Sequence, residues 1–200
     1  MEFTAPLLWY SRGPSLTMNR ATGVEAGGST FASVVGPDGK SNSAMAFSPA
    51  TGLTDTVAAM TADFTVMFGL SNVSSDITVV DLGDNNGQIN IIISSGVYYL
   101  RFVSDGETHT QALSWDGTGW VSLKVTRTGD LLTMSENGSL LNTFSLLTSE
   151  SYGGSVQVMN GQTGRLFDFR IYASAVSENA FDYYYDDIIQ HSGDSTCPVW

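Results

Sequence analysis

The sequence predicts an all-β domain built as a sandwich of two antiparallel sheets. Short runs in which apolar and polar residues alternate recur along most of the 200 residues, and 21 glycines and several turn dipeptides separate them. With 42% hydrophobic and 11% aromatic residues, the chain is long enough to bury one core as a single domain. We therefore expect about twelve strands in two sheets.

The segment 120–141 is the most informative, because it has the pattern of two strands and two tight turns. Its first half, WVSLKVTR, alternates with the period of two that is expected of a half-buried strand. Thr128-Gly129-Asp130 then reverses the chain, and a second strand runs back to Asn137-Gly138. Asn-Gly is the dipeptide best suited to the positive φ values of a hairpin turn, so we expect this segment to be a hairpin in a sheet and not an active site.

The remaining strands are expected where similar runs occur between turn residues. The run Ile89-Asn90-Ile91-Ile92-Ile93 is too apolar for a strand with one face in solvent, and we place it centrally in a sheet. Before residue 120, expected strands cover 64–70, 77–82, 89–94, 97–103 and 108–115. After residue 138, they cover 140–146, 155–159 and 166–172.

Two of these segments resemble the laminin-G-like and concanavalin A-like family of jelly-roll sandwiches. One mark is the strand that opens on Trp120 and leads through a turn to Asn137-Gly138. The second is GRLFDFRIY at 164–172, followed by 175–178 and an aromatic stretch, which resembles the closing pattern of that family. Segments 38–47 and 63–66 resemble its opening strands. The resemblance covers about residues 36–190 and implies a jelly roll with few helices.

The resemblance divides the chain into three parts. Residues 1–35 are expected to be a first strand or an arm that docks on a neighbouring subunit, residues 36–190 the jelly roll, and residues 191–200 a tail. One short helix is expected over 177–189, with Ser177 as its N-cap.

The charge of the chain excludes one class of partner. Its net charge is −12, with eight Lys and Arg in all, whereas nucleic-acid binding depends on clustered basic residues. No run of 18 apolar residues occurs, so we expect no membrane insertion, and the first 15 residues lack the basic and apolar regions of a secretory signal. Cys197 is the only cysteine, which leaves no intrachain disulfide.

Catalysis is not expected. The fold also houses glucanases, which need two carboxylates at alternating strand positions on one face, and Glu107, Glu136, Glu150 and Glu178 are isolated from one another. The two histidines are not near a Gly-x-Ser-x-Gly turn, and His109 is interpreted as a surface or packing residue.

One loop has the residue types of a calcium site. Asp81, Asp84, Asn85 and Asn86 would offer oxygen ligands on a single turn, and the resemblance implies that such a cation lies at the sandwich rim. The alternative is a plain hairpin turn, because Asp-Asn-Asn-Gly adopts left-handed conformations without an ion. The plain turn is favoured, since the EF-hand spacing is absent. No other cofactor is expected.

Glycan recognition needs an exposed aromatic ring to stack on a sugar, with amides or carboxylates beside it. The candidates on expected loops are Trp115 with its neighbour Asp116, and Tyr152 beside two glycines. Trp120 is excluded because it resembles the core tryptophan of the family.

Three functions follow from these features. The missing export signal and the apolar start favour a virion component, such as a phage fibre, spike or head decoration protein, that forms a homo-oligomer or contacts other virion proteins. The alternative is a free extracellular lectin-like module that binds a glycan, with or without calcium. A glucanase-like hydrolase is the third, and fold alone supports it.

Overall fold

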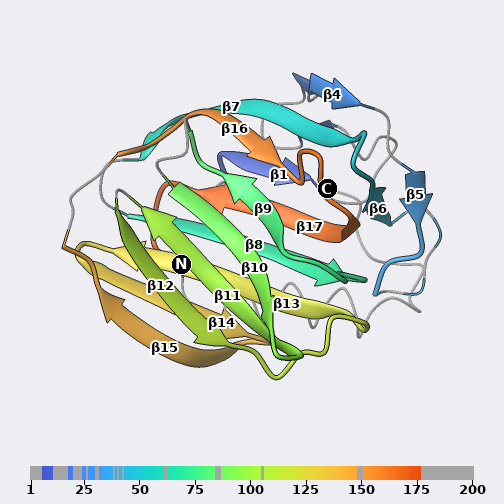
Figure 1. The fold of residues 1–200 in the computed structure, drawn as a ribbon. Helices are drawn as coiled ribbons and strands as arrows, with labels where there is room; N and C mark the ends of the chain where they lie inside the picture. The colour runs from blue at the N-terminus through green and yellow to red at the C-terminus, as the bar shows by residue number, and fades with distance from the viewer. Residues whose placement is uncertain are drawn as a thin grey trace, which may run out of the picture.

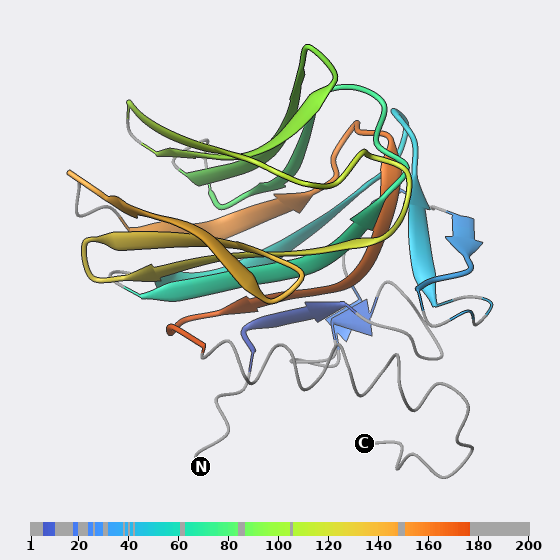
Figure 2. The same ribbon diagram turned by 90° about the horizontal axis from the view of Figure 1, so that it is seen from below.

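The computed structural model describes residues 6–10, 18–19, 24–25, 27–29, 32–37, 39, 41, 43–60, 63–83, 87–104, 106–147 and 151–176. These residues form two antiparallel sheets that face each other as a sandwich, and the described part contains no helix (Figures 1 and 2). A separate two-stranded sheet joins β2 (Met18–Asn19) to β3 (Val24–Glu25).

The eight-stranded sheet has the order β15-β14-β13-β8-β17-β6-β5, and β1 also pairs with β17. Its strands are β1 (Leu8–Tyr10), β5 (Ala32–Val34), β6 (Ala44–Phe47), β8 (Phe64–Ser71), β13 (Val121–Thr128), β14 (Leu131–Glu136), β15 (Ser139–Ser145) and β17 (Gly164–Tyr172). A bulge at Asp168 divides β17, so that its first half pairs with β6 and its second half with β1 on the same side.

The seven-stranded sheet has the order β12-β11-β10-β9-β16-β7-β4 and faces the viewer in Figure 1. Its strands are β4 (Gly27–Ser29), β7 (Gly52–Met60), β9 (Ile77–Asp81), β10 (Gly87–Ser94), β11 (Val97–Ser104), β12 (Glu107–Ala112) and β16 (Tyr152–Val158). β10 lies between β9 and β11, which confirms the central position expected from its isoleucines.

The core lies between the two sheets and takes alternate residues from each strand. In β8, Phe64, Val66 and Phe68 belong to the main core cluster, whereas Thr65 and Met67 between them point to the other face of the sheet. The whole of β8 is nonetheless buried, so the outer face of the eight-stranded sheet is covered at this strand.

The predicted hairpin at 120–141 is confirmed. β13 pairs with β14 across a turn at Gly129 and Asp130, and β14 pairs with β15 across Asn137-Gly138. Asn137 has φ 49° and Gly138 has φ 78°, the left-handed values that an Asn-Gly turn provides.

The expected strands from residue 64 to residue 172 all exist, with shifts of up to three residues at their ends. β7 was missed. The segment 1–35, expected as a strand or a docking arm, contributes β1, β4 and β5 to the two sheets. The helix expected over 177–189 and the tail at 191–200 lie outside the described residues.

Candidate functional site

Trp115 does not offer an exposed ring, and that expectation is wrong. Its side chain is 9% exposed and packs on Tyr98 with ring centroids 5.2 Å apart. Its Nε1 donates a hydrogen bond to the carbonyl of Gly119 at 2.7 Å, and its main-chain N–H donates to Glu136 at 2.9 Å. A ring held in this way belongs to the core and cannot stack on a sugar.

Tyr152 is also buried, at 1% exposure, so the second expected stacking residue is wrong for the same reason. Its ring meets Phe64 edge-on at 5.2 Å, and its hydroxyl lies 2.6 Å from the Oγ of Ser104. The guanidinium of Arg127 lies 5.7 Å from the centre of the ring. The following glycines indicated a loop, but they form a bulge inside β16 against β7.

Asp116 is exposed, as expected, but its carboxylate accepts hydrogen bonds within its own turn. The Oγ1 of Thr118 donates to its Oδ1 at 2.7 Å, and the main-chain N–H of Thr118 donates to the same oxygen at 3.0 Å. The hydrogen bond from the Thr118 side chain, with the backbone bond from the same residue, holds the pKa of Asp116 below its ordinary value.

Asp81 is the only residue of the expected calcium site that the structure describes. It is half-buried at the end of β9, and its Oδ2 accepts a hydrogen bond from the Nε2 of Gln88 at 3.1 Å. Asp84, Asn85 and Asn86 lie outside the described residues. Among the residues that the structure does describe, no three His, Cys, Asp or Glu side chains gather to hold a metal ion.

A polar hollow lies on the seven-stranded sheet, with a volume of about 160 Å³. Its walls come from β9, β10, β16 and the turn that follows β16. It is lined by Thr78, Asp81, Gln88, Gln157, Asn160 and Gln162. Every lining residue carries a hydroxyl, a carboxylate or a carboxamide, and none is apolar.

Strand alternation places these side chains on the outer face of the sheet. Asp81 is flanked by two core residues, Val80 and Leu82, and Gln157 is flanked by Val156 and Val158, also in the core. β16 pairs with β9 so that Gln157 lies opposite Asp81, and β10 pairs with β9 so that Gln88 lies opposite Asp81 from the other side. Three strands therefore present one row of polar groups to the exterior.

Hydrogen bonds fix the orientation of several lining amides. The Nδ2 of Asn160 donates to the Oε1 of Gln157 at 2.7 Å, and the Nε2 of Gln162 donates to the carbonyl of Asn160 at 3.1 Å. The hydroxyl of Thr78 donates to the Oδ1 of Asn90 at 2.8 Å. A carboxamide has two donor hydrogens and an acceptor oxygen, so the hollow offers both kinds of partner to the hydroxyl groups of a ligand.

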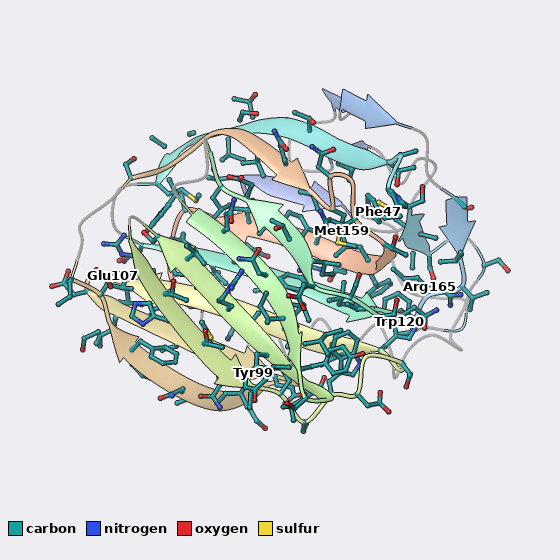
Figure 3. The ribbon with its side chains drawn as sticks, in the orientation of Figure 1. Phe47, Tyr99, Glu107, Trp120, Met159 and Arg165 are labelled. Carbon is teal, nitrogen blue, oxygen red and sulfur yellow. The ribbon has the colours of Figure 1, made fainter. Side chains whose placement is uncertain are left out.

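Sequence reasoning missed Tyr99, an aromatic residue on the same outer face. It is half-buried on β11, where it lies opposite Ile92 of β10 and two residues before Arg101 (Figure 3). The signal was present, because the next residue, Leu100, belongs to the core and the alternation directs Tyr99 outward.

Among the described residues that line the hollow, Asp81 is the one carboxylate, whereas glycoside hydrolysis uses a pair. His109 lies elsewhere, with its ring 5.1 Å from Phe144 and its Nε2 3.0 Å from Glu107 (Figure 3). The interpretation of His109 as a packing residue is confirmed. Hydrogen bonding to a polar ligand is what this arrangement of side chains can perform.

No protein-family model matches the sequence, and no curated protein does either. Solved structures do match. The binding domain of botulinum neurotoxin DC in complex with rat synaptotagmin II superposes with a TM-score of 0.68 over 92% of this chain, at 17% identity. The same domain in complex with SialylT gives 0.67 over 92%, at 16% identity.

A third match comes from botulinum neurotoxin type C, whose cell entry depends on interaction with two ganglioside molecules. It gives a TM-score of 0.65 over 92% of this chain, at 14% identity. The fold is a concanavalin A-like jelly roll. The resemblance stated from the sequence is confirmed at the level of the fold. This chain spans about half the length of the matched chains, at 52%, 52% and 51%.

Proposed function

We propose that this jelly roll is a non-catalytic carbohydrate-binding module that holds a glycan on the outer face of its seven-stranded sheet. The observation that carries the proposal is the hollow lined by Thr78, Asp81, Gln88, Gln157, Asn160 and Gln162. Neutral amides and hydroxyls match the alternating donors and acceptors of sugar hydroxyl groups, and Tyr99 supplies an aromatic ring on the same face.

The matched toxin structures support the choice of ligand. One is a complex with SialylT, and another concerns interaction with gangliosides. Both belong to proteins of the same fold at low identity, so they add weight to a glycan over other polar ligands and do not define which sugar binds.

The test is a glycan array followed by calorimetry on the strongest ligand, with two matched glutamine variants. Gln157→Ala removes an amide from the hollow and should weaken binding about tenfold, the effect of losing one or two hydrogen bonds. Gln111→Ala is the control, because Gln111 bonds to Asn142 of the other sheet and lies outside the hollow. A blank array, or equal losses in both variants, would overturn the proposal.

We further propose that calcium modulates the binding of the glycan. Asp81 lies both in the hollow and at the start of the loop that the sequence singles out, so a cation bound by the loop would order one wall of the hollow. Addition of calcium should raise the melting temperature and EDTA should lower it. Equal melting curves in the two conditions would contradict calcium binding and favour a hairpin turn without an ion.

We also propose that the protein is extracellular and that it associates with further copies of itself. None of the matched structures favours the virion role expected from the sequence, which stays a prediction. Light scattering on the purified protein tests it: a ring or trimer would support assembly on a particle, and a monomer that binds glycan would favour the free module. No helix in the described part is long and apolar enough to cross a membrane.

A further inference from the structure

The outer face of the seven-stranded sheet continues beyond the hollow into a second polar row. Asn90 of β10 lies opposite Arg101 of β11, and both point outward because their chain neighbours belong to the core. Thr78, which also lines the hollow, lies opposite Asn90 on the other side. The two rows therefore form one continuous surface.

Two hydrogen-bond donors in this second row are buried and unpaired. Asn90 is 2% exposed, and its Nδ2 has no partner. The Nε of Arg101 is also buried without a partner, although the residue as a whole is half-buried. The bond from Thr78 to the Oδ1 of Asn90 fixes the amide, so its N–H donors are directed away from Thr78. Buried donors without acceptors cost free energy, and an acceptor supplied by a ligand would remove that cost.

The charge of Arg101 identifies the kind of acceptor. Within the described residues, the side chains of Arg127 and Arg170 have hydrogen-bond partners, and that of Arg165 has one once the Asn72 amide is turned to face it, whereas the Arg101 side chain has no hydrogen bond or ion pair. A guanidinium presents a fork of N–H donors whose geometry fits the two oxygens of a carboxylate or a sulfate. In a chain with 20 acidic and 8 basic residues, a cation without an ion pair to a described residue is the group that an anion would select.

We propose that Arg101 and Asn90 bind an anionic group of the glycan, so that the ligand is an acidic saccharide. This inference rests on the proposed function and specifies its ligand class. Arg101 and Asp81 lie two strands and about two residues apart, which is about 12 Å in a sheet. A disaccharide spans that distance, with its neutral hydroxyls in the hollow and its acidic group at Arg101, away from the charge of Asp81.

The experiment compares saccharides that differ only in the acidic group. Calorimetry would use three pairs: digalacturonic acid and its carboxyl-reduced form, sialyllactose and lactose, and a sulfated glucosamine disaccharide and its desulfated form. The unmodified protein should bind the acidic member of at least one pair about tenfold more tightly, the effect of one charge-assisted contact. That preference should decrease as salt is added.

Two variants test whether the preference for the acidic saccharide comes from the row formed by Asn90 and Arg101. Arg101→Gln and Asn90→Asp should each bring the affinities for the acidic and neutral members of the pair to within about twofold of each other. Arg165→Gln is the control, because it removes the same charge from β17 of the other sheet (Figure 3). Circular dichroism checks that each variant is folded.

The outcomes separate the two proposals. Equal binding of neutral and acidic members would overturn the acidic ligand and leave the carbohydrate-binding function standing. A preference that survives in Arg101→Gln, or that Arg165→Gln also removes, would overturn the assignment to this row. Binding of no saccharide by the unmodified protein would overturn the function, and the inference with it.

Discussion

Two arginines on the outer faces of the two sheets have opposite surroundings. Arg170 of β17 is 3% exposed and pairs with Asp168, with Nη2 and Oδ2 2.7 Å apart and Nε and Oδ1 3.0 Å apart. Arg101 of β11 is half-buried, and its Nε has no partner. On the eight-stranded sheet, the charge of Arg170 is therefore neutralised by Asp168. On the seven-stranded sheet, the Nε of Arg101 has no partner among the described residues.

This difference teaches how to separate a structural face from a binding face. Burial alone would lower the pKa of Arg170, but the charge of Asp168 and the proximity of Tyr172 outweigh it and raise that pKa. The stabilisation that comes from the raised pKa is lost only in strongly alkaline solution, so this pair holds at any physiological pH. A satisfied ion pair of this kind stabilises the fold, whereas the unsatisfied donors on the other sheet are the ones that we propose for a ligand.

Removal of the ion pair between Asp168 and Arg170 should have the largest effect on the stability of the protein. Asp168→Asn leaves Arg170 buried without its counter-charge, and the free energy of unfolding should fall by about 3–5 kcal/mol. Asparagine suits the substitution because residue 168 has φ 47°, which Asn tolerates. Urea unfolding curves measure the effect. Arg101→Gln should change the same free energy by less than about 0.5 kcal/mol, and a similar loss in both variants would contradict the comparison.

A pair of tyrosines sharpens the contrast between the interior and the open face. Tyr152→Phe removes the hydroxyl that lies 2.6 Å from Ser104, and the protein should lose about 1–3 kcal/mol of stability because buried polar partners are left behind. Tyr99→Phe, on the outer face of β11, should leave stability unchanged. Thermal unfolding of both variants would show it, and a larger loss for Tyr99→Phe would reverse their assigned roles.

Asn90→Val should act in the opposite direction to these losses. It replaces a buried amide that has an unpaired donor with a residue favoured in strands. The Thr78 hydroxyl loses its acceptor but lies at the hollow, where water can replace that acceptor, so stability should rise by up to about 1 kcal/mol. Affinity for the acidic saccharide should fall in the same variant. Urea unfolding and calorimetry together test this exchange of function for stability, and a destabilised variant with normal binding would show that Asn90 is structural.

The smallest effect is expected at Asp116, which is exposed. Its lowered pKa means that its contribution is present above the ordinary carboxyl range and is lost as the pH falls through the lowered value. The melting temperature of Asp116→Asn should therefore be slightly below that of the unmodified protein in neutral and mildly acidic solution, and the two should converge in strong acid. A scan of melting temperature against pH measures it.

The strands could be predicted from sequence because alternation and turn residues are local signals. β7, GLTDTVAAM, was missed because its buried positions do not alternate regularly. The hollow could not be predicted, since Asp81 and Gln157, which are far apart in the sequence, meet only where β16 pairs with β9. Trp115 and Tyr152 were assigned to the surface by their polar and glycine neighbours, and burial there is decided by contacts with distant strands.

The pairing of β1 with β17 has a consequence for folding kinetics. Leu8 lies opposite Ile171, so this ladder closes a loop of almost the whole sandwich and forms after the hairpins that need only short loops. Because synthesis runs from the N-terminus, β1 leaves the ribosome first and has no partner strand until β17 has been made. The exposed side of β17 is then an open strand edge, and the rate at which β1 reaches it sets how long the nascent protein can pair with other chains.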